Sequence, residues 1–144
     1  MTWEDHANVR FQETTEKNES NIRITFSGDG FNSVTGTDAE DDSCKEDSMV
    51  LAGLPDRYPP LPEHRRSVLH EFGHALGLEH EHQGPAARRL LKLNEALVKT
   101  DRRGVQYVQD NILDEVEEDE DLWNYTNFDP ASIMTWVVIH PVSR

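Results

Sequence analysis

The most informative segment of this chain is His70-Glu71-Phe72-Gly73-His74-Ala75-Leu76-Gly77-Leu78-Glu79-His80. Residues 63–76 repeat apolar side chains at helical spacing, which predicts an amphipathic helix through the first half of the segment. Pro62 suits the first turn of this helix, and Gly77 suits its end because glycine adopts a positive φ at the least cost. We therefore expect a helix that carries the two histidines and stops at a glycine turn.

The spacing of the histidines predicts a metal site. His70 and His74 are four residues apart, so both imidazoles project from one helical face and can reach one zinc ion at about 2.0–2.1 Å. Glu71 lies about 100° round the helix, where its carboxylate can hydrogen-bond a zinc-bound water without becoming a ligand. His80 is too far along a straight helix, but a sharp turn at Gly77 would let it supply the third nitrogen.

A purely structural interpretation explains less of the segment. An amphipathic core helix with surface histidines accounts for the apolar stripe and for Gly77, but not for the spacing of the histidines. Five fixed positions coincide by chance with a frequency on the order of 10⁻⁶ per start point. The metal-site interpretation is therefore preferred.

The segment resembles the signature of the metzincin metalloproteases, H-E-x-x-H-x-x-G-x-x-H followed by a Met-turn. Downstream, Ser132-Ile133-Met134 looks like the Met-turn of the astacin-like and serralysin-like branches, and Glu81 after His80 is similar to astacins. The resemblance implies a zincin-like catalytic domain of the α/β (α+β) class, with a mixed twisted sheet, an active-site helix and a Met-turn. We expect one domain over residues 1–144, with the zinc site at 70–80 and the Met-turn at 132–134.

The activity implied by this resemblance is zinc-dependent hydrolysis of peptide bonds by an endopeptidase that holds one catalytic Zn²⁺. The zinc-bound water would lose its proton to Glu71 as general base, and Met134 would support the zinc site from below. Substrates would be polypeptides, and by family analogy residues 49–52 would form the edge strand that pairs with them. The substrate-binding residues expected on this basis are Met49, Val50, Leu51, Ala52 and Trp136.

Departures from the family pattern leave a second interpretation open. Trp136 stands where astacins have a tyrosine that ligates zinc, and an indole N–H cannot ligate a metal. Only one cysteine is present, so the astacin disulfides are absent. The family's first strand normally precedes the segment that corresponds to residues 3–11, and no such strand stands before it in the sequence given, so we expect a short or N-terminally trimmed member. The alternative is a catalytically impaired metzincin-like module that binds zinc and acts as a binder.

The remaining patterns predict further elements. Apolar and polar residues alternate at 9–11 and 22–26, and 49–52 is a short apolar run, so all three are expected to be strands. A second helix is expected at 86–99. Residues 110–121 contain eight acidic residues and are expected to form a solvated segment. Carboxylates can bind calcium, but this run has no EF-hand pattern and calcium is unsupported.

Composition excludes several partners. The 144 residues carry a net charge of −14, which argues against binding to nucleic acid or to an anionic membrane surface. No apolar run approaches the roughly 20 residues of a membrane span. The start of the chain is not a signal peptide, so the sequence leaves localisation open, whereas the family resemblance suggests secretion. Cys44 lies among acidic residues and is expected to be a bystander, and the protein is expected to be a monomer.

Overall fold

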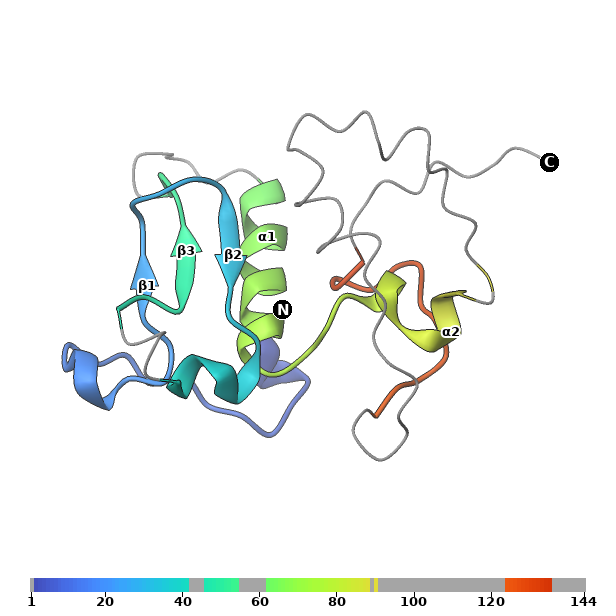
Figure 1. Ribbon diagram of the computed structural model, residues 1–144, viewed down its shortest axis with the longest axis horizontal. Coiled ribbons are helices and arrows are strands. Elements are labelled where there is room, and N and C mark those ends of the chain that lie inside the picture. Colours follow the sequence, from blue (N-terminus) through green and yellow to red (C-terminus); the bar gives the residue numbers. More distant parts are fainter. Residues whose placement is uncertain (1, 42–45, 55–61, 89, 91–123, 136–144) are drawn as a thin grey trace. The chain divides into compact units, whose positions relative to one another are not determined.

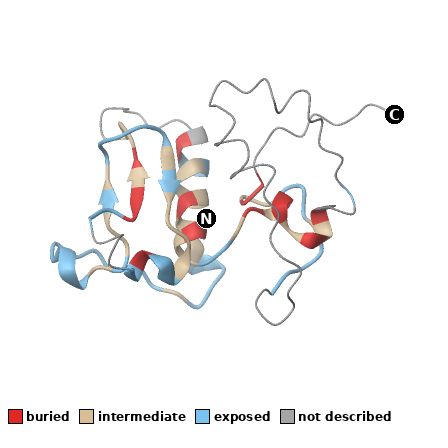
Figure 2. Ribbon diagram, viewed as in Figure 1, coloured by how far each residue is buried: buried red, intermediate tan, exposed pale blue. Residues whose placement is uncertain are grey.

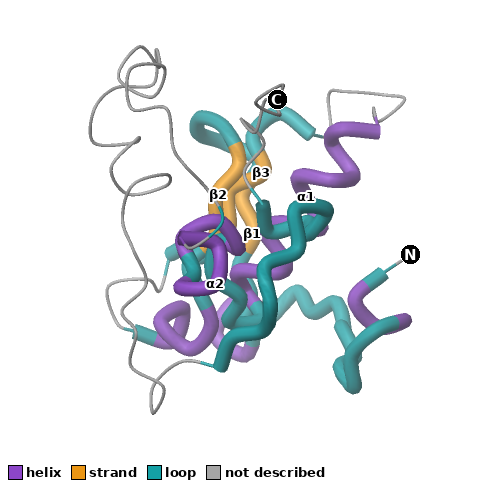
Figure 3. The backbone as a smooth tube through the Cα atoms, turned by 90° about the vertical axis from the view of Figure 1, so that its right-hand side faces the viewer, coloured by secondary structure: helices purple, strands orange, loops and turns teal. Residues whose placement is uncertain are grey.

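The computed structural model describes residues 2–41, 46–54, 62–88, 90 and 124–135 (Figure 1). The chain divides into two compact units, Met1–Leu78 and Glu79–Arg144. Each unit is described by itself below. Much of the described chain outside the sheet and the long helix consists of loops and single helical turns (Figure 3).

The first unit is built around a three-stranded mixed sheet. Its strands are β1 (Ile24–Thr25), β2 (Phe31–Ser33) and β3 (Met49–Leu51), in the order β1-β3-β2. β1 runs parallel to β3, whereas β2 runs antiparallel to it (Figure 1). The helix α1 (Pro62–Ala75) contacts both β2 and β3. This confirms the expected α+β class, with a mixed sheet and one long helix.

The core of the first unit lies where β3 meets the elements around it. Met49 has an exposed fraction of 0% and Leu51 of 4%, and Ala39 is also buried. Buried residues lie on β3 and recur along α1, so the helix turns one side toward the interior (Figure 2). The predicted helix over 63–76 and the predicted strands at 22–26 and 49–52 are therefore confirmed, with shorter bounds for both strands.

Two expectations for the first unit are wrong. Residues 9–11 are not in a strand; Phe11 packs its ring edge-on against Phe72, with 5.1 Å between the ring centroids. Residues 49–52 were expected to form an edge strand, yet β3 is the middle strand and pairs on both sides. A continuous apolar run is typical of such an interior strand. The substrate-pairing role expected for Met49, Val50, Leu51 and Ala52 therefore does not fit the sheet.

The second unit begins with a short helical turn, η5 (Glu81–Gln83), followed by α2 (Pro85–Arg88). The helix predicted over 86–99 is described only at its start. The acidic run 110–121, Cys44 and Trp136 lie outside the described residues. Within the described ranges, no helix has both the length and the apolar character that crossing a bilayer requires.

Candidate metal centre

Two of the expected ligands lie one turn apart on α1. The Nε2 atoms of His70 and His74 are 3.2 Å apart, and the two rings meet edge to face. In a tetrahedral zinc site with bonds of about 2.0–2.1 Å, two ligand nitrogens are about 3.3–3.4 Å apart. The separation in this helix therefore suits two ligands of one zinc ion.

A glycine turn ends α1 directly after these histidines. The Gly77 N–H donates to the His74 carbonyl at 2.7 Å, and the Leu78 N–H donates to the Gly73 carbonyl at 3.0 Å. These two bonds form a Schellman motif, which needs a residue with positive φ just beyond the helix. Gly77 has a φ of 90°, a conformation that is strained for any residue with a Cβ.

The same turn orients His74. The Leu78 carbonyl oxygen lies 2.8 Å from His74 Nδ1, so Nδ1 donates its hydrogen there and Nε2 keeps a lone pair directed toward His70. Burial lowers the pKa of His74, and the bond to Leu78 opposes this shift more weakly. Both effects of the site, the fixed tautomer and the neutral ring, favour binding of a metal ion through Nε2.

His80 belongs to the second unit and is oriented by a side chain. Its Nδ1 lies 2.8 Å from Oε1 of Gln83, and both residues are buried. The Gln83 N–H also donates to the His80 carbonyl, at 3.0 Å, which closes the turn. An amide oxygen can only accept, so Nδ1 donates and Nε2 of His80 is left as the possible ligand atom.

The three predicted ligands together can hold one metal ion. One ligand atom from each of His70, His74 and His80 lies within 4.8 Å of the others. Three imidazoles are a ligand set that zinc favours, and three protein ligands are typical of catalytic zinc sites. Among the described residues, the neighbouring His82 is not part of this cluster, although it is buried and its ring lies 5.3 Å from that of His80.

Glu71 follows His70 on α1 and is nearly inaccessible, with an exposed fraction of 6%. Burial raises the pKa of its carboxyl group to about 7. A carboxyl group whose pKa lies near neutrality can both accept and return a proton at that pH. This raised pKa fits the general-base role predicted for Glu71 from the sequence, which stays a prediction.

The predicted Met-turn is a compact turn within the second unit. Met134 is buried, and its N–H donates to Ser132 Oγ at 3.2 Å. Glu81, the residue after His80, is hydrogen-bonded to this turn: its N–H donates to the Met134 carbonyl at 3.1 Å, and its Oε1 accepts from the Asp129 N–H at 3.0 Å. Glu81 thus links the segment after His80 to the predicted Met-turn. In the sequence, only its position next to a predicted ligand points to this role.

Sequence reasoning missed two groups that orient the ligands. Gln83 lies three residues after His80, a spacing that becomes meaningful only once η5 has formed. The Leu78 group is a backbone carbonyl, which no side-chain pattern can reveal. A third contact, from the Trp3 indole N–H to the Leu69 carbonyl at 2.8 Å, attaches the N-terminal segment to α1 beside His70.

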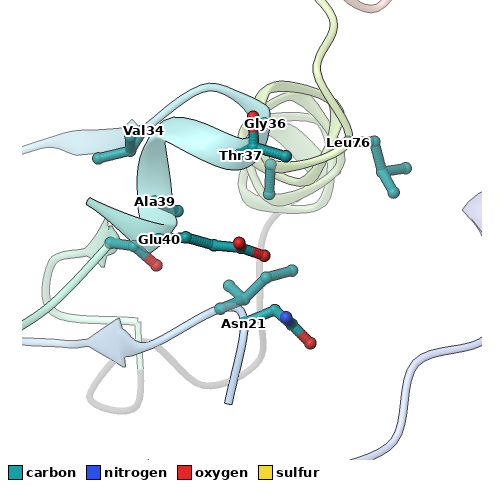
Figure 4. Close-up of a pocket in the computed structure, with 10 residues that line it drawn as sticks. Asn21, Val34, Gly36, Thr37, Ala39, Glu40 and Leu76 are labelled. Carbon is teal, nitrogen blue, oxygen red and sulfur yellow. The ribbon is translucent and has the colours of Figure 1, made fainter. Parts of the chain in front are cut away.

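A cavity of about 260 Å³ lies beside the C-terminal end of α1 (Figure 4). Its wall includes Ala75 and Leu76 from the helix end and Gly36, Thr37 and Ala39 from the short helix η3 (Gly36–Glu40). The lining therefore comes within one residue of Gly77 along the chain.

Comparisons with known proteins identify one informative likeness. No protein-family model matches the chain, and no curated protein matches it in sequence. A solved structure described as the structure of myroilysin superposes with a TM-score of 0.72 at 29% sequence identity, over 93% of this chain. The fold is that of myroilysin. This chain spans 66% of the length of the myroilysin chain.

Proposed function

We propose that this protein is a zinc-dependent endopeptidase of the metzincin type. The observation that carries the proposal is the cluster of His70, His74 and His80 on a fold that matches myroilysin, a metalloprotease. A metalloprotease fold and a three-histidine site together support a zinc peptidase. Within the metzincins, the Ser132-Ile133-Met134 segment and Glu81 support a place close to the astacin-like or serralysin-like branches.

The three histidines would hold the metal ion through neutral ring nitrogens. Because none of them carries a negative charge, the ion would keep its full positive charge. When bound, zinc supplies a Lewis acid that polarises the scissile carbonyl and lowers the pKa of a coordinated water. Leu78 and Gln83 contribute by holding the Nδ1–H of His74 and of His80, which keeps their Nε2 atoms unprotonated.

Glu71 would move the protons of the reaction. It would accept a proton from the attacking water and return it to the departing amine, as general acid–base catalysis requires. Its burial and its pKa of about 7 support this role because the carboxyl group can exist in both protonation states near neutral pH.

The peptide substrate would add to β2 instead of β3. β1 and β2 lie at the two edges of the described sheet, whereas β3 is occupied on both sides. Of the two edge strands, β2 is the one that packs against α1, the helix that carries His70 and His74. An extended peptide can extend a sheet by pairing with an edge strand. Met134 would pack beneath the zinc site, as its resemblance to the Met-turn implies and its burial supports.

Metal analysis and a digestion assay test this proposal. The purified chain should bind one zinc per molecule and cleave an unstructured protein, and a zinc chelator should abolish the cleavage. One zinc without cleavage would instead support the zinc-binding module that Trp136 suggests. A chain that takes up no zinc would contradict both interpretations.

A further inference from the structure

The backbone of η3 lies directly against the turn that ends α1. A Cβ placed on Gly36 would lie 3.3 Å from Gly77 Cα and 3.8 Å from Gly77 N, and Gly36 has a φ of 54°. The two helices are in contact, and Gly36 and Thr37 are seen beside α1 in Figure 4. The contact is therefore one glycine backbone against another, and a Cβ at Gly36 would fit only if the backbone moved by a few tenths of an ångström.

This contact lies next to the cavity at the helix end. Gly36 itself lines the cavity of about 260 Å³, together with Ala75 and Leu76 at the end of α1. Gly36 is the residue of η3 whose missing Cβ permits the close approach to Gly77. A Cβ added to Gly36 would therefore press against the backbone of Gly77.

The Gly77 turn in turn determines where one ligand points. It delivers the Leu78 carbonyl to Nδ1 of His74 at 2.8 Å, and a shift of a few tenths of an ångström at Gly77 would change that bond. Hydrogen bonds to the distal nitrogen of a histidine ligand set its tautomer and ring orientation.

We propose that Gly36 is a positioning residue for the metal centre, which acts on His74 through Gly77 and the Leu78 carbonyl. The inference rests on the proposed function because it assigns Gly36 a role in holding the metal ion. It adds a residue that lies 34 positions before the nearest predicted ligand in the sequence, from Gly36 to His70.

Two substitutions at Gly36 and one control separate contact from backbone strain. Gly36→Ala introduces both a Cβ against Gly77 and the strain of a positive φ. Gly36→Asn keeps the Cβ, but asparagine tolerates a positive φ better than alanine does. Gly30→Ala is the matched control, because Gly30 also has a positive φ, 68°, and its Cβ would meet nothing within 4 Å.

The experiment measures zinc affinity by competition with a chromophoric chelator, together with the visible absorption spectrum of the Co²⁺-loaded protein. We expect affinity to fall about 10-fold in Gly36→Ala and in Gly36→Asn, at the lower end of the 10–100-fold typical of lost support for a ligand. Gly30→Ala should match the wild type. The cobalt bands should shift in the Gly36 variants only, because they report ligand geometry and not overall stability.

Three outcomes would overturn the inference. One is equal zinc affinity and equal cobalt spectra in Gly36→Ala and Gly30→Ala. Another is recovery of normal affinity in Gly36→Asn, which would assign the effect to strain. The third is loss of the metal-free fold in both Gly36 variants by circular dichroism, since the proposed role is local. In each case wild-type zinc binding and cleavage would leave the proposed function intact, whereas wild-type protein without zinc would remove that function first.

Discussion

The two units hold their candidate ligands in different ways. In the first unit, His70 and His74 are spaced by the helix itself, and a backbone carbonyl orients His74. In the second unit, His80 lies in a short turn and is oriented by the Gln83 side chain. The helical pair should therefore tolerate side-chain changes around it, whereas the third ligand should depend on one particular side chain.

The largest effect is expected at Glu71, which is predicted to act in the reaction but not to hold the metal ion. Glu71→Ala should lose peptidase activity by about 10²–10⁴-fold, the usual contribution of a positioned general acid–base group, and still bind one zinc. Glu71 is buried and follows His70 in the sequence, but it is not part of the cluster of His70, His74 and His80 that can hold the metal ion. Cleavage assays and metal analysis on the same preparation give both readouts.

Glu19→Ala is the control for this substitution, because Glu19 is an exposed glutamate of the short helix η2 (Lys17–Glu19). It should keep both zinc and activity. Undiminished turnover by Glu71→Ala would refute the assignment of the general base.

The next test compares the two orienting groups directly. Gln83→Ala should weaken zinc affinity about 10–100-fold, because His80 Nδ1 loses its acceptor. Leu78→Ala should leave zinc affinity unchanged, because the carbonyl that accepts from His74 belongs to the backbone and the Leu78 side chain is 40% exposed. Isothermal titration with Zn²⁺ measures both. Equal losses in the two variants would break the distinction between the two units.

A smaller effect is expected on folding stability. Gly77→Ala should lower the free energy of unfolding by roughly 1–2 kcal/mol, because alanine resists a positive φ. Gly84→Ala, in the second unit, should cost less, since Gly84 has a φ of −69° and a Cβ there would make only an ordinary contact with the Glu81 carbonyl. Urea unfolding of the metal-free variants provides the comparison, and a larger loss in Gly84→Ala would contradict it.

The smallest expected effect concerns the N-terminal segment that reaches α1 through Trp3. The Thr2 backbone N–H, and more weakly its hydroxyl group, hydrogen-bonds the Asp5 carboxylate and holds the pKa of Asp5 below 3.8. A carboxyl group whose pKa is lower in the folded than in the unfolded state stabilises the fold at pH values above its unfolded-state pKa. This contribution is lost as the pH falls through the folded-state pKa. An NMR titration should place the Asp5 pKa below 3.8, and an unshifted value would show that the bond does not persist in solution.

Local patterns predicted the helix and the clustering of the three histidines well. The four-residue spacing of His70 and His74 depends only on the helical period, and the need for a turn before His80 pointed to Gly77. Alternation was a poorer guide. Residues 9–11 alternate as a strand would, but Phe11 packs against Phe72 of α1 instead of pairing in the sheet.

Long-range contacts were beyond the reach of the sequence. The apolar run 49–52 predicted a strand but not its place in the middle of the sheet, because that place depends on partners 15 or more residues away, such as Ile24 opposite Met49. Likewise, Gly36 carries no local signal for its contact with Gly77.

By itself, then, the sequence determined which residues could hold a metal ion, because ligand spacing follows from local backbone geometry and side-chain chemistry. Only the tertiary structure decided which groups orient their side chains and which strands lie at the edges of the sheet. Leu78 acts through a backbone carbonyl, which every residue has, and β3 is an interior strand because it pairs with β1 on one side and with β2 on the other. Such properties arise when distant segments pack together, so no local pattern encodes them.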